Sequence, residues 1–124
     1  MESRPRNFTR TIAVVDDDKD LRTSLGDLLE SVGYTALIFD SADSFLSSDA
    51  RDGVDCVISD IQMKGMNGLE LARTVRSSNT PIILITAFPT PEISCQAKSA
   101  GVRQLLFKPF NSQALIDDLQ GIFA

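Results

Sequence analysis

Short apolar runs alternate with longer amphipathic stretches along this 124-residue chain. The runs are rich in Val, Ile and Leu, and those at 54–59 and 81–86 are almost continuously apolar. Such runs are typical of strands that helices cover on both faces, as in a parallel sheet. The pattern predicts strands at 11–16, 35–39, 54–59, 81–86 and 103–107.

The stretches between these runs repeat apolar residues at helical spacing. In 19–32 one helix face would carry Leu21, Leu25, Leu28, Leu29 and Val32. Four further helices are predicted after capping or loop residues, namely after Ser41, the loop at 65–68, Thr90 and Asn111.

Strands and helices that alternate in this way predict one α/β domain, a parallel sheet with helices on both faces. We see no internal repeat, linker or low-complexity tract in the sequence. We assign residues 11–124 to this domain and residues 1–10 to a flexible lead-in.

Composition narrows the class of function. A net charge of −5 argues against a nucleic-acid-binding surface, and no apolar run approaches the length of a membrane span. The chain has no histidine, which excludes histidine-based acid–base catalysis and histidine metal ligands. Cys56 and Cys95 lie in different segments, and we expect them to be unpaired, as in a reducing cytoplasm.

Polar side chains follow four of the predicted strands. Asp16 and Asp17 follow the first, Asp60 follows the third, Thr86 ends the fourth and Lys108 follows the fifth. Because the carboxyl ends of parallel strands share one edge of a sheet, we expect these side chains to converge. Such a cluster can bind a divalent cation and accept a phosphoryl group.

Each of these residues also has an ordinary structural explanation. Aspartate is common in turns and at helix N-caps, and we assign a capping role to Asp18 or Asp20. Threonine is common in strands, and lysine is common at surfaces. It is the combination of all four strand ends that favours phosphoryl chemistry.

Five segments resemble the receiver domain of two-component response regulators, a CheY-like family. Two of them, the aspartate triplet at 16–18 and the NGLE segment at 67–70, look most like its FixJ/NarL type. The segments are VDDD at 15–18, SDIQM at 59–63, MNGLE at 66–70, ITA at 85–87 and FKPF at 107–110. The resemblance implies a flavodoxin-like doubly wound sheet of five strands in the order 2-1-3-4-5. It also implies a cis peptide bond between Lys108 and Pro109.

The resemblance further implies a role for each residue at the strand ends. Asp60 would accept the phosphoryl group, and Lys108 and Thr86 would contact that group afterwards. The ligands of a bound Mg²⁺ would be Asp17, Asp60 and the main-chain carbonyl of Gln62, with Asp16 acting through water.

The partners implied by the family are a histidine kinase as phosphodonor and a fused or separate output domain. The face formed by the fourth and fifth strands and helices would switch, and would bind a partner or a second copy of the chain. The domain itself would touch neither nucleic acid nor membrane and would work in the cytoplasm. It would be no enzyme beyond catalysing its own phosphorylation and dephosphorylation.

Two departures from the family keep alternatives open. Lys64 stands where many receivers have proline, and Leu105 stands where an aromatic residue is usual. A binding module that acts without phosphorylation is therefore one alternative. A less favoured one is a phosphatase of the haloacid-dehalogenase type with Asp16 as nucleophile, although Asp20 stands where that motif has Thr or Val.

Overall fold

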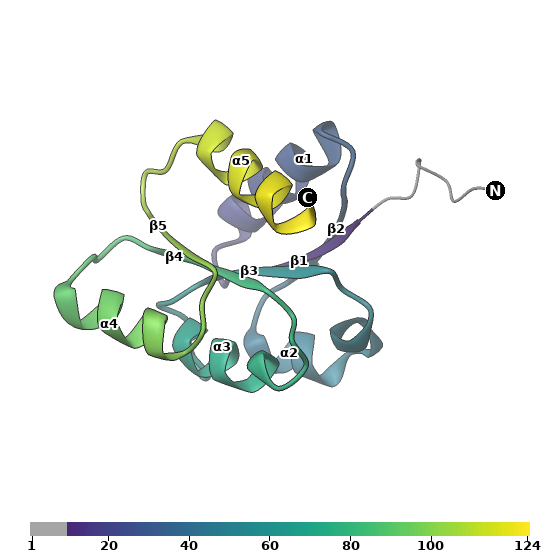
Figure 1. Ribbon diagram of the computed structural model, residues 1–124. Coiled ribbons are helices and arrows are strands. Elements are labelled where there is room, and N and C mark those ends of the chain that lie inside the picture. Colours follow the sequence, from purple (N-terminus) through teal and green to yellow (C-terminus); the bar gives the residue numbers. More distant parts are fainter. Residues whose placement is uncertain (1–9) are drawn as a thin grey trace.

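The predicted strands form one parallel sheet in the computed structural model, which describes residues 10–124 (Figure 1). The strand order is β2-β1-β3-β4-β5, which confirms the predicted topology. The lead-in predicted at residues 1–10 lies outside the described residues except for Arg10. Each boundary lies within two residues of its prediction: β1 (Thr11–Val15), β2 (Thr35–Phe39), β3 (Cys56–Asp60), β4 (Ile82–Thr86) and β5 (Gln104–Phe107).

Helices cover both faces of the sheet, with α1 and α5 on one face and α2, α3 and α4 on the other (Figure 1). A 3₁₀ helix, η1 (Asp49–Asp52), follows α2 and was not predicted. No helix within residues 10–124 combines the length and the apolar character needed to cross a bilayer. The helix bounds are α1 (Lys19–Ser31), α2 (Ala42–Ser47), α3 (Gly68–Arg76), α4 (Pro91–Ser99) and α5 (Ser112–Phe123).

Each face of the sheet has its own apolar core, because alternate strand residues point to opposite sides. Ile12 of β1 packs in one core with Leu29 of α1 and Leu115 of α5. Its neighbour Ala13 lies in the other core with Phe45 of α2. The two cores explain why β3 and β4 are buried at every position, as their continuous apolar sequences predict.

Side-chain caps fix where the helices that follow the site begin. Asp18 caps α1, and Thr90 and Asn111 cap α4 and α5. At α3, Asn67 and Glu70 form a capping box in which each side chain accepts from the other residue's backbone N–H. Each cap contributes about 1 kcal/mol to helix stability. The loops after β1, β3, β4 and β5 therefore end at defined points.

We predict that Gly68 is required for the close approach of α3 to the end of β3. A Cβ at this position would press against the main-chain carbonyl oxygen of Asp60 and lie 2.9 Å from Ile61 Cα. Gly68→Ala should therefore lower the free energy of unfolding by about 1–3 kcal/mol, as measured by urea unfolding.

Gly121→Ala in α5 is the matched control, because nothing lies within 4 Å of a Cβ built there. This substitution should leave stability unchanged or raise it by up to about 1 kcal/mol, since alanine favours helix. Equal stability of the two variants would contradict the packing argument.

Candidate functional site

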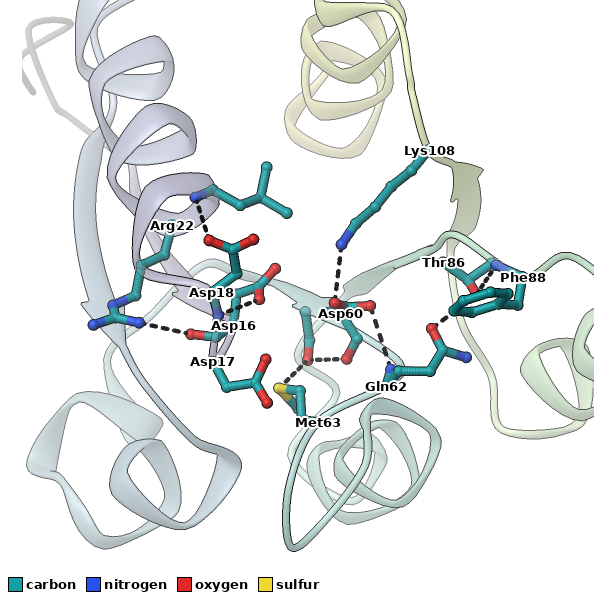
Figure 2. A network of polar contacts seen from close by, with 12 residues as sticks. Asp16, Asp17, Asp18, Arg22, Asp60, Gln62, Met63, Thr86, Phe88 and Lys108 are labelled. Atoms are coloured by element: carbon teal, nitrogen blue, oxygen red, sulfur yellow. Dashed lines mark hydrogen bonds and ion pairs between the residues drawn. The ribbon is translucent and has the colours of Figure 1, made fainter.

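The carboxyl edge of the sheet gathers the polar side chains that follow the strands. The register between β1 and β3 places Asp16 and Asp60 at the same level of neighbouring strands. The register between β4 and β5 places Lys108 just beyond the residue paired with Thr86. Figure 2 shows Asp16, Asp17 and Lys108 arranged around Asp60. The convergence that parallel topology requires is therefore present for all four strand ends.

Three carboxylates lie close together at this edge. One oxygen from each of Asp16, Asp17 and Asp60 lies within 4.8 Å of the other two. Asp16 is 1% exposed and Asp60 is 7% exposed, whereas Asp17 is exposed to solvent. Like charges at this separation raise the free energy of the cluster unless a cation lies among them. Carboxylate oxygens are the ligands that a hard divalent cation such as Mg²⁺ prefers.

One oxygen of the Asp16 carboxylate lacks a hydrogen-bond partner among the described residues. Its Oδ1 accepts from the backbone N–H of Asp18 at 2.8 Å. Its Oδ2 is buried and has no hydrogen-bond partner among the described residues. Buried polar atoms are nearly always paired with protein, water or an ion. The oxygen set therefore fits a bound cation, directly or through a water molecule.

Burial raises the pKa of Asp16 from 3.8 to about 6. The carboxylates of Asp60 and Asp17 raise this pKa as well, because each disfavours a further negative charge. The N–H of Asp18 and the ammonium group of Lys108 act in the opposite direction. Ionised Asp16 is therefore the costly member of the cluster when the cluster has no cation.

Lys108 supplies a positive charge from the far side of the site. Its Nζ lies 3.0 Å from Asp60 Oδ2, in a hydrogen-bonded ion pair. Its backbone N–H donates to the carbonyl of Thr86 at 2.8 Å, which holds the residue after β5 against the end of β4. The bond between Lys108 and Pro109 is cis, as the resemblance implied.

Thr86 is fully buried at the end of β4, and its hydroxyl makes two hydrogen bonds. The hydroxyl donates to Oε1 of Gln62 at 3.1 Å and accepts from the backbone N–H of Phe88 at 3.0 Å. The backbone N–H of Gln62 in turn donates to Asp60 Oδ1 at 3.3 Å. Gln62 therefore touches Asp60 through its backbone and Thr86 through its side chain (Figure 2).

Three contacts at the site were missed from the sequence. The predicted role of Gln62 used its main-chain carbonyl alone, and its side-chain bond to Thr86 was not foreseen. The backbone N–H of Lys64 donates to Asp17 Oδ2 at 3.2 Å, and Arg22 Nη1 donates to the Asp16 carbonyl at 3.2 Å. The signal for the second contact is the absence of proline at 64, because proline has no N–H to donate.

The sequence model of the response regulator receiver domain family matches residues 12–120. The transcriptional regulatory protein TdiR of Thauera aromatica is 32% identical over 126 residues, covering 100% of this chain and 56% of TdiR. The transcriptional regulatory protein FixJ of Bradyrhizobium diazoefficiens is 36% identical over 108 residues, covering 84% of this chain and 52% of FixJ. The chain thus spans about half the length of these two relatives.

A solved structure has the same fold over nearly the whole length of both chains. The chemotaxis protein CheY4 of Vibrio cholerae matches with a TM-score of 0.84 at 28% identity, covering 93% of this chain and 99% of CheY4. The family match, the two relatives and the shared fold all agree with the resemblance carried by the strand-end motifs. This chain belongs to the response regulator receiver domain family of two-component signalling.

Proposed function

We propose that this domain accepts a phosphoryl group on Asp60 from a histidine kinase and signals through the resulting change in charge. The observation that carries the proposal is the setting of Asp60. The residue is 7% exposed, and its carboxylate is paired with Lys108 at 3.0 Å and lies beside two further carboxylates. A single aspartate in a turn after a strand needs none of these neighbours.

The chemistry is nucleophilic displacement at phosphorus. An oxygen of Asp60 attacks the phosphorus atom of the donor's phosphohistidine, and the phosphorus–nitrogen bond breaks with its electron pair on the imidazole nitrogen. The product on this chain is an acyl phosphate. Lys108 is placed to pair with a phosphoryl oxygen, because its ammonium group already contacts Asp60.

A bound Mg²⁺ would be held by Asp17, Asp60 and the main-chain carbonyl of Gln62, with Asp16 acting through water. This assignment is supported by the partnerless oxygen of Asp16 and by the closeness of the three carboxylates. When bound, the ion supplies positive charge that offsets the phosphoryl oxygens during transfer.

The output of the domain would run through Thr86. A phosphoryl group on Asp60 offers new acceptor oxygens to the Thr86 hydroxyl, which also accepts from the backbone N–H of Phe88 in the β4–α4 loop. The face formed by β4, α4, β5 and α5 would then shift from one packing of these elements to another, and would bind a second copy or an output domain. TdiR and FixJ are named transcriptional regulators, so we propose an output domain in the parent protein and cytoplasmic action.

We predict Mg²⁺-dependent phosphorylation of Asp60 by a small phosphodonor such as acetyl phosphate. Intact mass should rise by one phosphoryl group in the wild type and not in Asp60→Asn, because an amide oxygen is a poor nucleophile. Asp27→Asn is the matched control, since Asp27 is an exposed carboxylate on α1, and it should be labelled like the wild type.

The same experiment tests the alternatives. Label on Asp16 that survives Asp60→Asn would point to the phosphatase-type mechanism. No label on the folded wild type with Mg²⁺ would favour the module that acts without phosphorylation. Either result would overturn the proposal.

We predict that the metal-free protein loses stability between about pH 4 and pH 6 because of Asp16. The folded pKa of Asp16 lies above its unfolded value, so the folded state binds the additional proton in this window and stability falls as pH rises. The complete shift corresponds to about 3 kcal/mol. Urea unfolding at a series of pH values, with a chelator present, measures it.

Asp16→Asn is the comparison, because an amide oxygen can still accept from the Asp18 N–H. With chelator above pH 6, Asp16→Asn should be more stable than the wild type. Added Mg²⁺ should narrow or reverse that difference, since binding stabilises the intact cluster. Parallel pH curves for the two proteins would contradict the assigned cost of Asp16.

A further inference from the structure

The side chain of Gln62 accepts the one hydrogen bond that the Thr86 hydroxyl can donate. A threonine hydroxyl has one O–H to donate and lone pairs with which to accept. In this structure the O–H is directed to Gln62 Oε1, and the oxygen accepts from Phe88 N–H. The hydroxyl therefore cannot donate to a phosphoryl oxygen until its bond to Gln62 is broken.

We propose that Gln62 is a positioning residue that latches Thr86, and with it the β4–α4 loop, in the unphosphorylated arrangement. This inference rests on the proposed function of Asp60 and adds a determinant of how readily the domain switches. The latch and the phosphoryl group are competing acceptors for one hydroxyl hydrogen. Phosphorylation moves the β4–α4 loop only when a phosphoryl oxygen replaces the amide oxygen of Gln62 as the acceptor of the Thr86 hydroxyl.

Because Thr86 is buried, water does not compete with Gln62 and the phosphoryl group for the hydroxyl hydrogen of Thr86. Thr86 is 0% exposed, so its O–H has no access to solvent and must donate to one of the protein or phosphoryl oxygens. Gln62 is exposed, so its amide is solvated once it is released. Breaking the latch therefore leaves no unpaired group behind, provided that the phosphoryl group takes up the hydroxyl.

The position of Gln62 makes the latch sensitive to the state of Asp60. Gln62 lies two residues after Asp60, and its backbone N–H donates to Oδ1 of the reacting carboxylate. A change at Asp60 therefore acts on the same residue whose side chain holds Thr86. On the other side of Thr86, the bond from Phe88 N–H links the hydroxyl to the loop that leads into α4.

The test is the affinity for beryllofluoride, a phosphoryl mimic, in the presence of Mg²⁺. We compare the wild type, Gln62→Leu, Thr86→Val and the double variant. Gln62→Leu should bind the mimic about two- to tenfold more tightly, because one net hydrogen bond no longer competes. In the Thr86→Val background the same substitution should have no effect, because no hydroxyl is left to latch.

The matched control is Gln120→Leu, an exposed glutamine near the end of α5, which should bind the mimic like the wild type. Unchanged or weaker binding by Gln62→Leu would overturn the latch. An equal gain in the Thr86→Val background would also overturn it, since Gln62 would then act on ligand access and not through Thr86.

A second measurement separates failure of the latch from failure of the proposed function. If the wild type binds no mimic, phosphorylation of Asp60 is wrong, yet the latch is still measurable without ligand. Amide hydrogen exchange at Phe88 should be faster in Gln62→Leu than in the wild type, because the Thr86 hydroxyl is no longer held in place. Equal exchange rates would overturn the latch.

Discussion

Repulsion among the carboxylates of Asp16, Asp17 and Asp60 is the constraint around which this edge of the sheet is organised. Their oxygens lie within 4.8 Å of one another, and two of the three residues are buried. Lys108 offsets this charge from the end of β5, two strands away from β3, and reaches across the end of β4 to Asp60. Asp60 is buried and Lys108 is partly buried, so removing the lysine would leave a buried carboxylate without compensation, which is destabilising. The strand order is therefore a condition for the charge balance of the site.

The sequence predicts the sheet and the strand ends for the same physical reason. Strands covered on both faces need apolar residues at every position, so β3 and β4 are visible as continuous runs, and the polar residue that ends each run is conspicuous. Asp60 and Thr86 are found in this way. What the sequence does not contain is the direction of single side chains in the loops. The bond from Thr86 to Gln62 and the bond from Lys64 to Asp17 join residues that are 24 and 47 positions apart.

The β3–α3 loop acts on the site through its backbone. The N–H groups of Gln62 and Lys64 donate to Asp60 and Asp17, and each approaches a carboxylate from the same loop. A proline at 64 would remove the second of these donors. The departure from the family at Lys64 therefore has a consequence in the main chain, independent of the charge on its side chain. It leaves Asp17 with a hydrogen bond that orients one of its two oxygens.

Thr86 connects this charge cluster to β5, the strand at one end of the sheet, and to the loop that leads into α4. Its carbonyl accepts from Lys108, and its hydroxyl bridges Gln62 and the β4–α4 loop. In the register of the sheet its partner is Phe107, which is 46% exposed on β5. Leu105 lies two residues earlier on the same side of the strand and already packs against the core beneath α4. The β5 residue paired with Thr86 is thus an exposed phenylalanine, while Leu105, where the family usually has an aromatic residue, is already packed.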